Sequence, residues 1–343
     1  MQSRTGSNPY QGFLAAIALT LLGLCTNLRA ESLAVDAVAQ RLVPPVVAAH
    51  RSGKFVSGSP LRKVQSTLKS GAAKVLEMDL RLTHDGVVVV VHDPYLSGHG
   101  ACSGPVEQFT FAELGACQHA IDGESVTRFD QILDVVNGRA VVNAEFKTQE
   151  VIAPAIRIVE AKHAKSWVYF QATGDFTKYR MARKIDPDIA LLLKITSDDM
   201  LGQAIALHDP HLIILELDQD FVTPKRLARI HAAHMLVSEN TFRYQFTEER
   251  FVASCDRVFG LGIDIAVTNN PSSCATQRGT WRNNLSGRRH SNPFDRPHLR
   301  ADFDDNKYAL ELFVAGLITL AIALSVLGKR WLARKARARR KSA

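Results

Sequence analysis

The stretch Val46–Pro94 decides the fold, because it contains three short apolar runs that each end in ionisable residues. The runs read VVAAHR (Val46–Arg51), KVLEMDL (Lys74–Leu80) and VVVVVHDP (Val87–Pro94). Val-rich runs of this length, bounded by Gly, Pro and polar residues, are typical of strands that are buried on both faces. We therefore expect the chemistry of this chain at the ends of buried strands.

The second run carries two carboxylates, and the runs on either side of it end in histidines. Successive side chains on a strand alternate between its faces, so Glu77 and Asp79 point to the same side. Adjacent buried carboxylates repel each other and are costly to desolvate unless a cation lies between them. His50 and His92 could both reach that cation. Two imidazoles beside a carboxylate-bound metal suit acid–base cleavage of a phosphate ester.

These motifs resemble the glycerophosphodiester phosphodiesterase family, one of the phospholipase C-like phosphodiesterases with a TIM-barrel fold. HR, ExD, DG and HD occur in the family's order at His50–Arg51, Glu77–Asp79, Asp85–Gly86 and His92–Asp93. AEFK (Ala144–Lys147) resembles the family's E-x-K strand end, and GIDIAVTNNP (Gly262–Pro271) resembles its closing G-x-D-x-x-x-T-D-x-P strand. The resemblance covers roughly Val46–Ser273, and the ordered combination is far more specific than any one motif.

The resemblance assigns a metal to three carboxylates and acid–base chemistry to two histidines. Glu77, Asp79 and Glu145 are the implied ligands of one divalent cation. An all-oxygen ligand set suits Mg²⁺ or Ca²⁺ better than Zn²⁺. His50 and His92 are the implied general base and general acid, in an order that these motifs leave open.

Other polar residues at strand ends are candidates for holding the substrate. Arg51 could bind a phosphate oxygen through its planar fork, and Lys147 could neutralise the same group as a point charge, which makes Lys147 a third catalytic candidate. Asp93 is expected to orient its loop rather than to contact the substrate. Five later strand ends could line the pocket, since the mouth of a barrel is built from such positions: Gln171, Lys194, Glu216, Glu239 and Asn240.

Three departures from the family pattern concern substrate recognition. GSP (Gly58–Pro60) stands where the family has E-N-T, and SENT (Ser238–Thr241) replaces W-T-V-N. SGHGACSG (Ser97–Gly104) replaces an Arg- and Thr-rich loop. Cleavage of a phosphodiester is therefore better supported than any particular diester.

The remaining pattern predicts a (β/α)8 TIM barrel over residues 31–280. When the extra strand at Val87–Val91 is left out, eight apolar runs alternate with helical segments such as Val126–Val136, which matches the usual barrel of about 250 residues. Residues 31–45 are expected to be a lead-in. Ser97–Asp122 is too long for an ordinary connection and is expected to be an inserted lid or specificity loop.

The two ends of the chain predict export and a membrane anchor. Residues 1–30 resemble a signal peptide, with an uncleaved signal anchor as the alternative. Residues 281–307 form a polar linker, and 308–328 are long and apolar enough to be one transmembrane helix. Eight of the 42 basic residues follow Gly328, and the other 34 balance the 34 acidic residues, so the charge of +8 resides in the tail 329–343.

This charge distribution sets the expected partners and location. Because the body is neutral, we expect no nucleic-acid binding. The positive-inside rule places the tail in the cytoplasm and the barrel on the other side, in the periplasm or outside the cell. The expected protein is thus a single-pass membrane protein with an extracytoplasmic catalytic domain.

Five cysteines become four if the signal is removed with Cys25. Four cysteines in an exported chain allow two disulfides with three possible pairings. The pairs close in sequence are Cys102 with Cys117 and Cys255 with Cys274, and four free thiols are the alternative.

We therefore expect metal-dependent hydrolysis of a glycerophosphodiester or lysophospholipid by two histidines. A phospholipase D-like barrel such as sphingomyelinase D is the alternative, because it shares a His, ExD, His arrangement and a disulfide-bearing lid. FKT (Phe146–Thr148) and the Cys-bearing insertion favour that alternative, whereas Pro94 after HD and the TNNP motif favour the first interpretation. A catalytically inactive, membrane-tethered binding barrel is the third hypothesis.

Overall fold

The structure is a computed structural model that describes residues 34–54, 56–97, 102–117, 126–242 and 253–276. Within these ranges no helix is long and apolar enough to cross a membrane. The predicted signal, polar linker, transmembrane helix and basic tail all lie outside the described residues.

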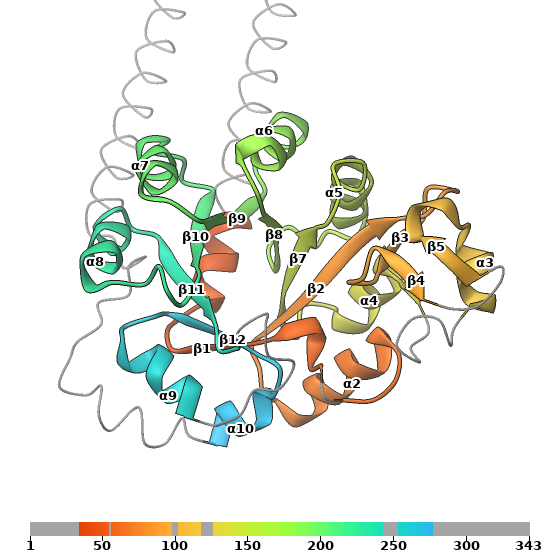
Figure 1. The fold of residues 1–343 in the computed structure, drawn as a ribbon, viewed down its shortest axis with the longest axis horizontal. Helices are drawn as coiled ribbons and strands as arrows, with labels where there is room; N and C mark the ends of the chain where they lie inside the picture. The colour runs from red at the N-terminus through yellow and green to blue at the C-terminus, as the bar shows by residue number, and fades with distance from the viewer. Residues whose placement is uncertain (1–33, 55, 98–101, 118–125, 243–252, 277–343) are drawn as a thin grey trace, which may run out of the picture. The chain divides into compact units, whose positions relative to one another are not determined.

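Eight parallel strands in the described ranges form a closed barrel, as predicted (Figure 1). Each strand pairs with the next, and β1 pairs with both β2 and β12, which closes the ring. The strands are β1 (Val46–Ala49), β2 (Val75–Leu82), β7 (Val141–Phe146), β8 (Val168–Ala172), β9 (Ala190–Ile195), β10 (Leu212–Leu217), β11 (Leu236–Asn240) and β12 (Ile265–Thr268).

Helices cover the outside of the barrel (Figure 1): α2 (Pro60–Ser70), α4 (Phe129–Val136), α5 (Ile152–Ala161), α6 (Phe176–Ile185), α7 (Asp198–Ala206), α8 (Pro224–Ala232), α9 (Ala253–Gly260) and α10 (Pro271–Thr276). Local sequence sets several of their ends. The Thr223 hydroxyl accepts from the Arg226 amide at the start of α8, and Pro224 occupies its first turn, where a missing N–H costs nothing. Gly71 ends α2 in the left-handed conformation.

Residues 34–41, within the predicted lead-in, are helical. Val38 and Leu42 are fully buried and pack with Val46, Val75 and Val141, which lie at the starts of their strands. This segment therefore closes the amino-terminal end of the barrel, because the apolar interior would otherwise be open to water there. The polar strand ends described below lie at the opposite end.

An antiparallel extension continues from β2. β3 (Val88–Val90) pairs with the end of β2, and β6 (Thr127–Arg128) pairs with β3. The helix predicted over Val126–Val136 therefore begins only at Phe129. Thr127 and Arg128 are instead in a strand, because their backbone groups form hydrogen bonds with the open edge of β3.

The segment between β3 and β6 folds into a small unit of its own, here called the insert (described residues 95–97 and 102–117). Its elements are β4 (Tyr95–Ser97), β5 (Ser103–Pro105), η3 (Val106–Gln108) and α3 (Phe111–Ala116). Leu96, Val106 and Leu114 pack with Val89 and Val91 of the barrel extension in a separate apolar core. A disulfide joins Cys102 to Cys117 with an S–S distance of 2.03 Å. The insert is thus a packed unit rather than a bare loop.

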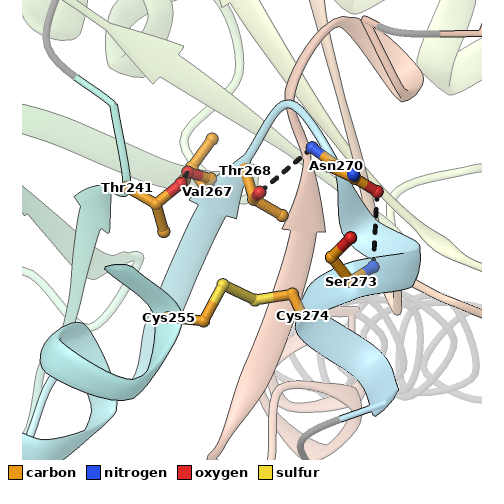
Figure 2. Close-up of a disulfide and its surroundings, with 7 residues drawn as sticks. All are labelled: Thr241, Cys255, Val267, Thr268, Asn270, Ser273 and Cys274. Carbon is orange, nitrogen blue, oxygen red and sulfur yellow. Dashed lines mark hydrogen bonds between the residues drawn. A yellow bond between two sulfur atoms is a disulfide. The ribbon is translucent and has the colours of Figure 1, made fainter. Parts of the chain in front are cut away.

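A second disulfide joins Cys255 of α9 to Cys274 of α10, whose Cα atoms are 5.8 Å apart (Figure 2). The start of α10 is capped in the same region, because the Asn270 side chain accepts from the Ser273 amide at 3.3 Å. The Asn270 amide in turn donates to the Thr268 hydroxyl at 3.1 Å. These contacts hold the turn that follows the last barrel strand.

We expect the Cys255–Cys274 bridge to stabilise the whole barrel. Its sulfurs belong to buried residues and it closes a loop of 19 residues, so removing it with the double substitution Cys255→Ala and Cys274→Ala should lower the free energy of unfolding by about 3 kcal/mol. Urea unfolding measures this. The matched control removes Cys102 and Cys117, whose core is separate from the barrel's and whose loss should affect global unfolding less. An unchanged unfolding midpoint in the first variant would contradict the expectation.

Candidate active site

Three buried carboxylates meet towards the carboxyl end of the β2–β7 pairing, as the sequence predicts. Asp79 lies opposite Glu145 in the register of these parallel strands, and Glu77 is two residues earlier on the same face of β2. The three residues are at most 9% exposed. One ligand atom from each lies within 4.8 Å of the others. The chain therefore concentrates negative charge in a poorly hydrated place.

Lys147 is the main compensating cation. Its Nζ lies 2.7 Å from Asp79 Oδ1 and 3.1 Å from Glu145 Oε2. Burial and the carboxylates of Asp79 and Glu145 raise the pKa of Glu77 well above its usual range. Burial also raises the pKa of Asp79, but the Lys147 ammonium and nearby imidazoles outweigh it, so this pKa is lowered. One ammonium thus satisfies only part of the cluster.

The donor set fits a hard divalent cation. The cluster offers carboxylate oxygens alone, and burial together with the neighbouring carboxylates raises the pKa of Glu77. Mg²⁺ and Ca²⁺ both prefer such oxygen ligands. Glu77, Asp79 and Glu145 are therefore the residues that could hold the cation.

His50 lies beside this cluster in the turn η1 (His50–Ser52) that follows β1. Its Nδ1 is 2.5 Å from Asn269 Oδ1, and its ring packs against Phe242 with centroids 4.4 Å apart. Because the amide oxygen of Asn269 accepts, Nδ1 carries the hydrogen and Nε2 keeps its lone pair. That Nε2 is 4.0 Å from Glu77 Oε2. Burial lowers the pKa of His50 to about 3, so the ring is neutral.

The backbone at Arg51 is held in a conformation that non-glycine residues rarely adopt. Arg51 and Ser52 have φ values of 48° and 55°. This conformation lets the Arg51 amide donate to Glu77 Oε2 at 2.7 Å, and Thr67 donates to the Ser52 carbonyl at 2.7 Å. Strain of this kind persists where surrounding contacts over-determine it, often at functional sites. Arg51 Nε is buried without a hydrogen bond to any described residue, 3.9 Å from Asp79 Oδ2.

His92 follows β3 on a segment without regular structure. Its side chain is 26% exposed, and its Nδ1 lies 2.6 Å from Asp93 Oδ1. Asp93 thus orients the His92 ring, whereas the sequence had predicted that it would orient its loop. The preceding amide, of Val91, donates to the Asp79 carbonyl at 3.0 Å, which places His92 beside the cluster.

Three of the five expected pocket residues form one hydrogen-bonded row. Gln171 Nε2 donates to Glu216 Oε2 at 2.9 Å, and Lys194 Nζ lies 3.4 Å from Glu216 Oε1. Burial raises the pKa of Glu216 to about 7, although Lys194 opposes the shift. The row continues to Asn143 of β7, whose Nδ2 donates to Gln171 Oε1 at 2.7 Å. The row thus begins on the strand that carries Glu145.

Glu239 is not brought to this group, which corrects the prediction for that residue. Its carboxylate is fully buried and accepts from Arg257 of α9, outside the barrel wall. Its neighbours Ser238 and Asn240 pair in register with Ile265 and Val267, which belong to the barrel interior. Because side chains alternate along a strand, Glu239 has to face the helix layer when Asn240 faces inward.

The sequence interpretation missed several supporting residues. Asn269 holds His50, and Thr173 donates to Glu145 Oε1 at 3.1 Å. Asn143 could have been found, since it lies two residues before Glu145 and hence on the same face of its strand. Asn269 also carried a signal, because it occupies the Asp position of the T-D-x-P motif. The role of Thr173 has no such signal in the sequence.

Comparison with known proteins identifies the class. Residues 61–273 match the Glycerophosphoryl diester phosphodiesterase family, so the chain belongs to that family, as its motifs predicted. The match begins after His50 and Arg51, whose place in the site therefore rests on the geometry above.

Individual proteins are similar to this chain in sequence or in fold. The probable glycerophosphodiester phosphodiesterase 2 of Mycobacterium tuberculosis is 27% identical over 112 residues, which are 33% of this chain and 40% of that protein's length. A putative glycerophosphoryl diester phosphodiesterase from Silicibacter pomeroyi has a similar structure, with a TM-score of 0.58, 20% identity and coverage of 71% of this chain and 96% of that one. A phosphodiesterase from Oleispira antarctica, solved with the product sn-glycerol-3-phosphate, has a TM-score of 0.55, 20% identity and coverage of 69% and 97%.

We expect Mg²⁺ or Ca²⁺ to stabilise the fold through the three carboxylates. Binding to the folded state alone adds about 2.7 kcal/mol at a concentration 100 times Kd, so the unfolding temperature should rise when the cation replaces EDTA. Glu77→Gln relieves repulsion and should reduce this rise without lowering the unfolding temperature in EDTA. Thermal unfolding followed by circular dichroism measures both. Glu216→Gln is the control, because it removes a buried carboxylate outside the cluster, and it should keep the rise.

Proposed function

We propose that this chain hydrolyses a glycerophosphodiester in a reaction that depends on a divalent cation. The observation that carries the proposal is the meeting of Glu77, Asp79 and Glu145 within 4.8 Å, with Lys147 bridging two of them and His50 Nε2 4.0 Å from a third. Family membership supports the reaction class, and a relative of similar fold holds sn-glycerol-3-phosphate. A soluble diester or a lysophospholipid would both present the required bond.

The cation would be held by Glu77, Asp79 and Glu145, and it would supply Lewis-acid stabilisation of charge on the phosphate oxygens. Arg51 offers a buried Nε without a hydrogen bond to any described residue, and this group would bind a phosphate oxygen directly. Lys147 would add a second positive charge at the same place. These residues would place positive charge where negative charge develops on the phosphate. Such electrostatic stabilisation is strongest in a site shielded from water.

His50 is the proposed general base and His92 the proposed general acid. Asn269 leaves Nε2 of His50 as the acceptor, so this atom would take a proton from the attacking water molecule as the water oxygen bonds to phosphorus. The bond between phosphorus and the alcohol oxygen breaks in the same displacement. His92, oriented by Asp93, would deliver a proton to that leaving oxygen. The step leaves His50 protonated and His92 deprotonated, and proton exchange with water restores both residues before the next turnover.

A lipid phosphodiesterase of the phospholipase D or sphingomyelinase D kind is the second candidate. The disulfide between Cys102 and Cys117 favours it, because it crosslinks the insert next to His92. The same carboxylates and histidines would serve that reaction. The choice between the two therefore depends on the substrate rather than on the catalytic residues.

Parallel assays decide between these functions. We expect hydrolysis of glycerophosphocholine, abolished by EDTA and restored by Mg²⁺ or Ca²⁺, with lower turnover on lysophosphatidylcholine and sphingomyelin. His50→Ala and His92→Ala should each lower kcat by about 10²–10⁴-fold with the fold intact. His208→Asn is the control, since this exposed residue has a left-handed backbone that Asn tolerates. A preference for sphingomyelin would favour the second candidate. Full turnover in excess EDTA would show that the reaction needs no divalent cation. Inactivity on every substrate would leave a binding barrel.

We also propose that the barrel works outside the cytoplasmic membrane, anchored by residues 308–328. The neutral body, the basic tail 329–343 and the two disulfides support this, since disulfides persist in oxidising compartments. Membrane contact would bring the site close to lipid headgroups.

Protease added to spheroplasts tests this topology. It should digest the barrel and spare a small membrane-embedded fragment that contains the tail, because the tail's positive charges resist translocation. An antibody against the tail detects that fragment. Digestion of the tail with protection of the barrel would invert the topology.

A further inference from the structure

Arg81 is a buried arginine that the proposed reaction does not use. It lies on β2 two residues beyond Asp79, where β2 has left its pairing with β7 and pairs with β3 instead. The residue is 7% exposed. A buried guanidinium is costly unless its N–H groups find acceptors, so its partners show what holds it there.

Those partners are the backbone of His92 and a carboxylate of the insert. Nε and Nη2 both donate to the His92 carbonyl oxygen, at 3.2 and 3.1 Å. Nη1 donates to Glu107 Oε1 of η3 at 2.7 Å. One rigid fork thus joins the strand of the carboxylate cluster, the proposed general acid and the insert.

The location of His92 makes this contact consequential. His92 lies past the end of β3, and the preceding residue is tied to the cluster by the bond from the Val91 amide to the Asp79 carbonyl at 3.0 Å. The hydrogen bonds from Arg81 then fix the carbonyl of His92 itself. Displacement of a catalytic group by about 1 Å can cost about 10²-fold in rate.

We propose that Arg81 is a positioning residue for His92, and that the insert acts on catalysis through Glu107 and Arg81. This inference rests on the proposed function. A fork of five N–H groups suits the role, because two of them hold one carbonyl while a third holds the carboxylate that orients the fork. The insert then serves as a fixed support for the general acid.

Other bonds anchor the insert independently of Arg81. The His84 amide donates to the Phe109 carbonyl at 2.8 Å, and the Phe111 amide donates to Asp85 Oδ1 at 3.0 Å. A separate apolar core and the Cys102–Cys117 bridge add to them. Substitution of Arg81 is therefore expected to move His92 without releasing the insert.

A double-mutant cycle between Arg81 and His92 tests the proposal. Arg81→Lys keeps the charge but loses the planar fork, and it should lower kcat on glycerophosphocholine by about 10- to 100-fold with little change in KM. In the His92→Ala background the same substitution should cost little more, because the group that it positions is absent. Losses that multiply in the double variant would overturn the proposal. Arg128→Lys is the matched control, since Arg128 makes a comparable fork to Asp130, and it should leave kcat unchanged.

Glu107→Gln provides a second route if Arg81→Lys does not fold, as thermal unfolding will show. This substitution keeps the Arg81 bonds to His92 but weakens the contact that orients the guanidinium. We therefore expect a smaller loss of kcat than for Arg81→Lys, and no loss in the His92→Ala background. Glu113→Gln is its control, because Glu113 only caps α3 within the insert. An equal loss in both backgrounds would contradict the role of the insert.

A change of leaving group separates failure of this inference from failure of the proposed function. The p-nitrophenyl ester of glycerol 3-phosphate releases a stabilised phenolate that needs no proton. His92→Ala should therefore be much less harmful on this ester than on glycerophosphocholine. Equal losses on both substrates would refute His92 as the acid, whereas the cycle on glycerophosphocholine still reports whether Arg81 acts through His92.

Discussion

Mutual repulsion among three buried carboxylates is the constraint on which the rest of this structure depends. Glu77, Asp79 and Glu145 are brought together by the register of two parallel strands, which the barrel cannot change without losing its ladder. Lys147 neutralises part of the charge, while burial and the two neighbouring carboxylates keep the pKa of Glu77 raised. A divalent cation is the simplest way to neutralise the negative charge that Lys147 leaves on the cluster. The same charge that is costly for folding therefore creates the affinity that the proposed chemistry requires.

The histidines and the arginine next to this cluster are held by contacts from elsewhere in the chain. His50 depends on Asn269, which precedes α10, and α10 is tied to α9 by the Cys255–Cys274 bridge (Figure 2). The left-handed turn at Arg51 aims its amide at Glu77 and leaves its Nε without a hydrogen bond to the described residues. Arg81 connects the backbone of His92 to the insert. Both disulfides thus lie in units that support a histidine of the site.

Much of the fold and the centre of the site could be predicted because their signals are local. Val-rich runs that end in charged residues indicate buried strands, and an E-x-D spacing puts Glu77 and Asp79 on one face. The predictions failed where a neighbour decided the outcome. The helix expected from Val126 begins at Phe129 because the edge of β3 takes Thr127 and Arg128 into the sheet. Glu239 was counted as a pocket residue, although the alternation that places Asn240 inside places Glu239 against Arg257.

The sequence by itself determined the class of barrel, the family and the ionisable residues at its centre, because period-two alternation and short motifs are properties of a few consecutive residues. Only the tertiary structure decided which nitrogen of His50 is the acceptor, which polar residues form a row from Asn143 to Glu216, and what Arg81 holds. Each of these depends on a partner on another strand, in the insert or 219 residues away, as for His50 and Asn269. Such contacts arise from barrel closure and packing, whose geometry no short segment of the chain specifies.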